Sequence, residues 1–119
     1  ELYNMSVLAE DIQNFDSNHT RFICITKDLK IYPGADRTSI MMVIPNKPGK
    51  LFSVLSRFSA VGANLVKLES RPIPNRDFEF MFYFDIEMSI YNEKFASLIS
   101  ELDHCEEQFK YFGTYSEII

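Results

Sequence analysis

An alternating run of side chains between Phe78 and Met88 constrains the fold of this chain more than any other feature. Every second position of the run is large and apolar, namely Phe78, Phe80, Phe82, Phe84, Ile86 and Met88. The positions between them are Glu79, Met81, Tyr83, Asp85 and Glu87. Because successive side chains of a β-strand point to opposite faces, the run predicts a strand with one face in a core. Core packing explains its aromatic residues better than a cofactor site does.

Flanking segments predict two further strands and a helix. Residues 40–44 form a short apolar run that ends at Pro45, which is typical of a strand covered on both faces. A turn at residues 46–49 follows, and apolar residues then recur at helical spacing until Gly62 ends the helix: Leu51, Phe52, Val54, Leu55 and Phe58. Residues 66–71 alternate as a half-buried strand, and residues 74–77 predict a turn.

The C-terminal part predicts a second helix and a last strand. Asn92 can cap the helix with its side-chain oxygen. The helix then places Phe95, Leu98, Ile99 and Leu102 in one stripe. Residues 109–115 predict the last strand, with Gly113 marking a bulge or the close approach of another backbone.

This order of elements predicts an α+β fold of ferredoxin-like βαββαβ type. Such a fold has a four-stranded antiparallel sheet with both helices on one face. The opposite face would then expose an apolar patch of Met41, Val43, Met81 and Tyr83. A stable monomer rarely tolerates such a patch, so we expect the chain to form a homo-oligomer.

Composition limits the class of protein. A chain of 119 residues with 46% hydrophobic residues is enough for one domain with a core. A net charge of -5 argues against a nucleic-acid surface, and the apolar runs are too short to span a membrane. Cys24 and Cys105 have no metal or redox spacing, so we expect two reduced and mostly buried thiols in the cytoplasm. The chain begins at Glu1 rather than at a methionine, and we expect it to be part of a longer protein.

The first 38 residues differ from the rest in their pattern. Residues 21–25 predict a short strand, and residues 27–38 form a polar linker that contains proline and glycine. We therefore expect three parts: residues 1–26, a linker at 27–38 and a globular domain at 39–119.

Two motifs resemble prephenate dehydratase, the enzyme that makes phenylpyruvate. One motif is Asn18-His19-Thr20-Arg21-Phe22, and the other runs from Gly62-Ala63-Asn64-Leu65 to Glu69-Ser70-Arg71-Pro72. Asn64 and Leu65 stand where the family more often has Leu and Val. The resemblance, which extends to the bifunctional chorismate mutase/prephenate dehydratases, implies that residues 39–119 are a regulatory ACT domain. Residues 1–26 would be the tail of the catalytic domain.

The same resemblance implies the roles of individual residues. Thr20, Arg21 and Phe22 would belong to the catalytic site of the parent enzyme, where a hydroxyl can assist the leaving group and a guanidinium can hold a substrate carboxylate. Taken alone, these three residues are more typical of a strand start with a solvated arginine, and only their distance and order relative to the ACT-like region favour the catalytic role. The resemblance also implies no cofactor, prephenate as the substrate of the parent enzyme, and a dimer or tetramer.

The predicted effector site binds L-phenylalanine between ACT domains. Its residues are Asn46, Pro48, Gly49, Leu51, Gly62, Ala63, Asn64, Leu65, Glu69, Ser70, Arg71 and Pro72. The helix start at residues 46–49 can offer free backbone amides to a carboxylate. Each segment also has a simpler interpretation, as a Pro-Gly helix start, a helix-stop glycine and a surface ion pair.

Other functions are less well supported by the sequence. His19 and His104 have no partners at metal spacing, so we predict no metal site. An enzyme fragment with residual activity would rest on Thr20 and Arg21 alone, so we expect this chain to be inactive. An RNA-recognition module has the same order of elements, but the acidic charge and the lack of a Lys/Arg-Gly-Phe strand signature argue against it.

Overall fold

The computed structural model describes residues 3–17, 19–105 and 108–118, apart from the side chain of Cys105. Four strands and two helices follow one another in the predicted order. They are β1 (Arg37–Pro45), α1 (Lys50–Ala60), β2 (Asn64–Pro72), β3 (Glu79–Glu87), α2 (Phe95–Cys105) and β4 (Gln108–Tyr115). None of the helices in the described ranges is long and apolar enough to cross a membrane.

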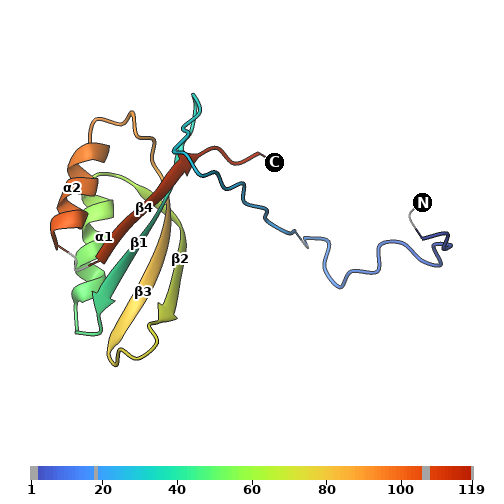
Figure 1. Ribbon diagram of the computed structural model, residues 1–119, viewed down its shortest axis with the longest axis horizontal. Helices are drawn as coiled ribbons and strands as arrows, with labels where there is room; N and C mark the ends of the chain where they lie inside the picture. Colours follow the sequence, from blue (N-terminus) through green and yellow to red (C-terminus); the bar gives the residue numbers. More distant parts are fainter. Residues whose placement is uncertain (1–2, 18, 106–107, 119) are drawn as a thin grey trace.

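The four strands form one antiparallel sheet in the order β2-β3-β1-β4. Ile40 of β1 and Leu68 of β2 both lie opposite Phe84, which places β3 between these two strands. Ile40 also lies opposite Tyr111 of β4, so β1 is central as well and β2 and β4 are the edges. Both helices cover the same face of the sheet, as Figure 1 shows. The predicted βαββαβ fold is therefore confirmed.

The core lies between the sheet and the two helices. The alternation that predicted β3 places Phe84, Ile86 and Met88 in this core, with Phe82 packed against it. Phe58 of α1 contacts Phe84 with ring centroids 5.3 Å apart. The remaining buried members come from β1 and the two helices, namely Ile40, Met42, Ile44, Val54, Leu98 and Leu102. Neither α1 nor α2 lies on the other face of the sheet, and we call that face the open face.

Local signals in the sequence correctly mark both ends of α1, the start of α2 and the bulge. Gly49 (φ 80°) precedes α1 and Gly62 (φ 73°) follows it, and both have the left-handed backbone that glycine adopts without strain. The side-chain oxygen of Asn92 accepts a hydrogen bond from the Lys94 amide at 2.9 Å, directly before α2. In β4 the register slips beside Gly113, so the predicted bulge is present.

Two predictions about the sheet are wrong. Phe78 does not continue the buried row of β3, because it lies in the preceding turn with φ 67° and its side chain is 78% exposed. Its carbonyl instead accepts a hydrogen bond from the Asn46 amide at 2.7 Å. Val43 is buried rather than exposed on the open face. It lies between Met81 of β3 and Gln108 of β4, so neighbouring side chains cover it even without a helix on that face.

The N-terminal part also departs from the expectation. Residues 21–25 are extended but pair with no strand in the described structure, and Phe22 and Ile25 are 89% and 90% exposed. An apolar run alone does not make a β-strand, because the backbone hydrogen bonds of a strand need a neighbouring strand as partner. Cys24 is exposed rather than buried, and the side chain of Cys105 lies outside the described residues. We call residues 19–36 the N-terminal segment; the chain leading to it runs away from the sheet in Figure 1.

The dimensions of the chain agree with this arrangement. The radius of gyration is 18.7 Å, whereas a compact domain of 100 residues has a value of about 13 Å. Regular secondary structure begins at Arg37, and the division of the chain at residues 26 and 38 stays a prediction.

Candidate functional site

The predicted ligand segments lie at two opposite ends of the sheet. Pro72 and Pro45 lie beside Phe80 and Glu79, so the last residues of β2 and the turn at 46–49 share one end. Asn64 lies opposite Glu87, at the other end. The nine residues of β2 extend over about 26 Å at 3.3 Å per residue. Within one chain, therefore, a single amino acid cannot contact both ends.

The turn at residues 46–49 leaves the start of α1 open. The Lys50 amide donates to the Lys47 carbonyl at 3.2 Å and the Ser53 amide to the Gly49 carbonyl at 2.9 Å. No side chain caps the helix in the described structure. The amides of Leu51 and Phe52, in the first turn, thus have no intrahelical acceptor. Such a helix start favours an anion, and the exposed side chain of Phe52 supplies an apolar surface beside it. The sequence pattern predicts Phe52 only as part of the apolar spacing of the helix and not as part of a site.

The segment from Gly62 to Leu65 ends one element and begins the next. The amides of Gly62 and Ala63 donate to the carbonyls of Ser59 and Phe58, which closes α1. Ala63 and Leu65 pack against the core. The Asn64 side chain donates to a Glu87 oxygen at 2.7 Å. These hydrogen bonds are typical of a glycine that ends a helix and is followed by an edge strand, which is the simpler interpretation of this segment.

Three charged side chains of β2 form an ion cluster on the open face. Glu69 pairs with Lys67 at 3.3 Å and with Arg71 on its other side. The hydrogen bond from Lys67, followed by the charge of Arg71, lowers the pKa of Glu69. Because the pKa of Glu69 is lower in the folded chain than in the unfolded chain, its ionised carboxylate stabilises the fold at any pH above the unfolded pKa. This stabilisation is lost as the pH falls through the folded pKa. Ser70 lies opposite Phe82 on the helix-covered face.

Among the three predicted catalytic residues, Arg21 is the one whose side chain bonds to the sheet. Its guanidinium forms an ion pair with Asp85 at 3.0 Å and donates to the Tyr115 hydroxyl at 2.7 Å. These contacts, with the hydrogen bond to Asp85 contributing most, raise the pKa of Arg21. Thr20 and Phe22 are exposed, and Asn18 of the same motif lies outside the described residues.

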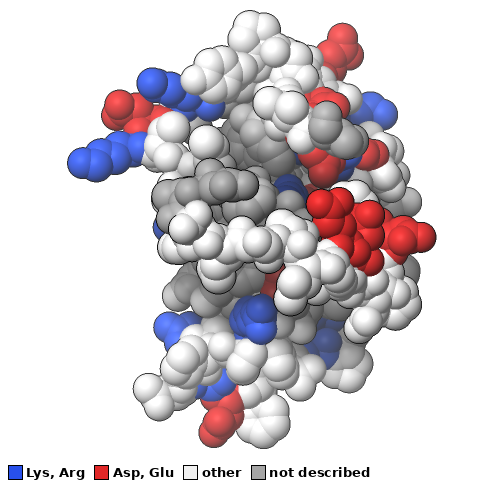
Figure 2. All heavy atoms as spheres, turned by 90° about the vertical axis from the view of Figure 1, so that its right-hand side faces the viewer, with Lys and Arg blue, Asp and Glu red and all other residues white. Residues whose placement is uncertain are grey.

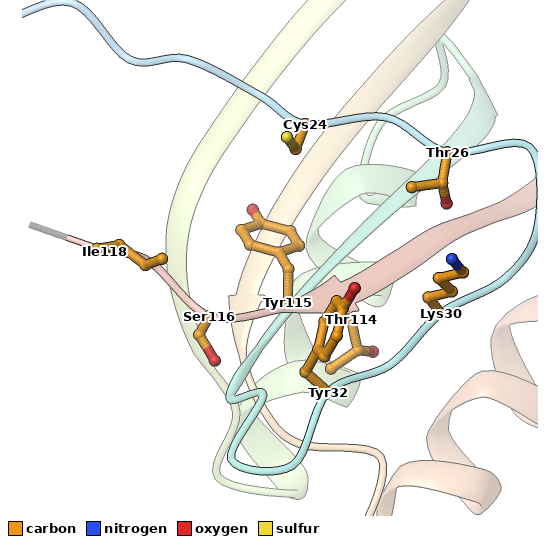
Figure 3. A pocket seen from close by; sticks show the side chains of 8 residues that line it. All are labelled: Cys24, Thr26, Lys30, Tyr32, Thr114, Tyr115, Ser116 and Ile118. Atoms are coloured by element: carbon orange, nitrogen blue, oxygen red, sulfur yellow. The ribbon is translucent and has the colours of Figure 1, made fainter.

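Two hollows lie between the N-terminal segment and the sheet. The larger, about 1600 Å³, is bordered by the open face and includes Arg21, Asp85, Glu69 and Arg71. The smaller, about 460 Å³, lies at the end of β4, and Figure 3 shows the residues around it: Cys24, Thr26, Lys30, Tyr32, Thr114, Tyr115, Ser116 and Ile118. Neither hollow includes the turn at 46–49 or the segment at 62–65.

The surface around the N-terminal segment can be described by its charges and by its capacity to bind a metal ion. Figure 2 shows basic and acidic side chains interspersed on the side that carries the N-terminal segment, and the acidic ones gather in one area. Among the described residues, no group of three or more His, Cys, Asp or Glu side chains could hold a metal ion.

Comparison with known proteins identifies the relatives of the chain. A scan against models of protein families finds no match. The chain is 35% identical over 118 residues to the bifunctional chorismate mutase/prephenate dehydratase of Aquifex aeolicus, across 98% of this chain and 32% of that protein. It is 33% identical over 118 residues to the prephenate dehydratase of Methanocaldococcus jannaschii, across 97% of this chain and 43% of that protein. Its homologues include prephenate dehydratases, bifunctional chorismate mutase/prephenate dehydratases and arogenate dehydratases.

A solved structure agrees with these relatives. The prephenate dehydratase of Arthrobacter aurescens, solved in complex with L-Phe, matches with a TM-score of 0.66 and 26% identity. The match covers 77% of this chain and 30% of that chain. This chain thus spans less than half the length of the prephenate dehydratases it resembles.

Proposed function

We propose that this chain is the L-phenylalanine-binding ACT regulatory domain of a prephenate dehydratase, preceded by the tail of its catalytic domain. The observation that carries the proposal is the likeness, in fold and in sequence, to a prephenate dehydratase solved with L-Phe. The parent enzyme would be a cytoplasmic lyase that converts prephenate to phenylpyruvate without a cofactor. L-Phenylalanine would lower its turnover by feedback inhibition.

The proposed effector site needs two copies of the chain. The strand β2 is an edge strand, with Val66 and Leu68 about two-fifths exposed. If two copies pair their β2 strands in antiparallel fashion about a two-fold axis, the end of β2 in one copy lies beside its start in the other. Residues 69–72 of one copy would then meet residues 62–65 of the second. This pairing unites segments that a single chain holds at opposite ends of the sheet.

The groups at this junction can bind the carboxylate, the ammonium group and the side chain of a free amino acid. The uncapped amides of Leu51 and Phe52 suit a carboxylate on the helix-covered side of the sheet. Arg71, whose side chain is 66% exposed, adds a positive charge at the same end of the sheet from the open face. Asn64 of the second copy can accept a hydrogen bond from the ammonium group. Leu51 and Phe52 supply apolar surface for a phenyl ring. A recognition site built in this way favours an L-aromatic amino acid over a small one.

Regulation then requires that phenylalanine bind one arrangement of the paired domains better than another. A ligand shifts an equilibrium only by its differential affinity, and a coupling of about 1 to 3 kcal/mol gives about 5- to 150-fold regulation. The linker at 27–38 joins the sheet to residues 20–22 and would transmit the change.

The RNA-recognition alternative has less support. The interspersed charges of Figure 2 and the net charge of -5 do not form the continuous basic surface that single-stranded RNA requires. A gel-shift assay at low salt with single-stranded RNA should therefore show no complex.

We expect Arg71→Ala to weaken L-phenylalanine binding by about 10-fold, because it removes a positive charge at the end of the sheet where the ligand carboxylate would bind. Lys94→Ala is the matched control, since Lys94 is exposed in the turn before α2 and surface changes of this kind stay within about 0.5 kcal/mol. Arg57 is not a suitable control. Although its position in α1 predicts a solvated side chain, Arg57 is half-buried and its Nη1 atom is fully enclosed.

Isothermal titration with L-phenylalanine measures both variants, and circular dichroism melting shows whether they are equally stable. Equal losses of affinity in Arg71→Ala and Lys94→Ala would contradict the assigned role of Arg71. A tenfold loss in the first variant alone, at unchanged melting temperature, would support it.

A further inference from the structure

One end of the open face carries a cluster of oxygen atoms contributed by three strands. The cluster consists of Ser39 of β1, Asp85 of β3 and Tyr115 of β4. The Ser39 hydroxyl donates to Oδ1 of Asp85 and lies 3.0 Å from the Tyr115 hydroxyl. Asp85 is only 8% exposed. A carboxylate this far removed from water needs a positive partner as well as hydrogen bonds.

Arg21 supplies the positive charge from outside the sheet. Its Nη1 atom lies 3.0 Å from Oδ2 of Asp85, and its Nη2 atom donates to the Tyr115 hydroxyl at 2.7 Å. The guanidinium carbon also lies 5.8 Å from the centre of the Tyr115 ring. Two hydrogen bonds and a ring contact thus fix the plane of the guanidinium, which a lysine could not reproduce.

Two other cations of the open face are engaged elsewhere. Lys67 lies opposite Asp85 in the register of β2 and β3, but its Nζ atom pairs with Glu69 at 3.3 Å. Lys110 lies over the ring of Phe112 at 5.6 Å. Within the described ranges, Arg21 is the only cation at ion-pair distance from Asp85. The contact joins residues 64 positions apart, so it holds the N-terminal segment against the sheet.

We propose that Ser39, Asp85 and Tyr115 form a docking site for Arg21 that withdraws this arginine from the substrate of the parent enzyme. The inference rests on the proposed function and on the role that the family resemblance implies for Arg21, which is to hold a substrate carboxylate. A guanidinium whose fork is bound to Asp85 and Tyr115 cannot make the same fork with a substrate. Asp85 is then a positioning residue, and capture or release of Arg21 couples the regulatory sheet to the catalytic tail.

The docking itself is tested on this chain by limited trypsin digestion, because trypsin must take the Arg21 side chain into its own pocket. We expect Asp85→Asn to raise the rate of cleavage after Arg21 by about tenfold or more. Glu79→Gln is the matched control, since Glu79 lies on the same face at the other end of β3 and pairs only with Arg76 in the described structure. Cleavage after Lys110 in β4 reports whether the sheet stays folded. Cleavage after Arg21 at the wild-type rate in Asp85→Asn would overturn the docking site.

A second variant covers the case in which Asp85→Asn unfolds. Tyr115→Phe keeps the ring and removes only the hydroxyl that accepts from Arg21. The side-chain 15N signals of Arg21 should be separately resolved in the wild-type chain, because the fork restricts rotation, and should average in Tyr115→Phe. Averaged signals in the wild-type chain would overturn the docking site without any variant.

The regulatory consequence is tested in the full-length parent enzyme. At saturating L-phenylalanine we expect Asp85→Asn to retain about five times the residual dehydratase activity of the wild type, with its L-phenylalanine affinity within about twofold. Wild-type inhibition at unchanged affinity would overturn the coupling. An enzyme that does not bind L-phenylalanine at all would refute the proposed function instead, while the digestion result would still decide whether Arg21 docks.

Discussion

The purified chain should convert no prephenate to phenylpyruvate above the rate in buffer. It contains Thr20 and Arg21, but it spans only 32% and 43% of the length of two prephenate dehydratases that it resembles. Enzymes accelerate reactions by about 10⁶-fold or more by holding several groups in one geometry. In this structure Thr20 is exposed and the Arg21 guanidinium is bound to Asp85, so these two residues do not form such a geometry with each other.

The assay follows the formation of phenylpyruvate, with a full-length prephenate dehydratase as the positive control. An Arg21→Ala variant of the chain identifies trace activity from a contaminating enzyme, which would persist in the variant. Turnover by the wild-type chain near the ordinary enzyme range of about 1 s⁻¹ or more, lost in Arg21→Ala, would contradict the proposed division into catalytic tail and regulatory domain.

Leu68→Lys should turn a dimer into a monomer and weaken L-phenylalanine binding by about 100-fold. Leu68 is the central residue of the edge strand β2, so a two-fold axis through this strand places the two copies of Leu68 close together. Two lysines facing each other repel, and charged residues on an edge strand oppose pairing. If the paired form falls to about 1% of the population, the apparent affinity falls by the same factor.

Phe112→Lys is the matched control, because Phe112 is an exposed aromatic residue of the opposite edge strand β4 that stacks on Tyr83. Analytical ultracentrifugation should show a dimer for Phe112→Lys and a monomer for Leu68→Lys. The reverse result would mean that the copies pack open face against open face, and it would contradict a ligand site built along β2.

The sequence predicts the order of elements because each element carries its own local signal. Alternation marks β3 from Phe80 onward, glycines mark both ends of α1, and Asn92 marks the start of α2. Phe78 is mispredicted because its apolar side chain fits the alternation, whereas the turn at 74–77 determines its backbone. A periodic pattern reports side-chain polarity and does not report where a turn ends.

The remaining errors and omissions concern contacts between distant segments. The apolar run at 21–25 satisfies every local criterion for a strand, but in the described structure no partner strand lies beside it. Val43 is buried by side chains of β3 and β4, which the sequence cannot place beside it before the strand order is known. The pairing of Arg21 with Asp85 spans 64 residues and follows from no spacing rule.

In the candidate site, too, some features follow from the local sequence and others only from the fold. The sequence resemblance selects residues 46–49, 62–65 and 69–72. Only the register of the sheet reveals that residues 62–65 lie at the opposite end of the sheet from the other two segments. That separation leads to the proposal of a site shared by two copies.

Thermal unfolding with L-phenylalanine, D-phenylalanine and L-alanine tests the central claim most directly. At a concentration about 100 times the dissociation constant, a ligand of the folded state adds about 2.7 kcal/mol to the free energy of unfolding. For a domain of this size that raises the melting temperature by roughly 10 °C. L-Phenylalanine should give this rise, whereas D-phenylalanine and L-alanine should give little. No rise with L-phenylalanine, or the same rise with all three amino acids, would contradict a phenylalanine-sensing function for this chain.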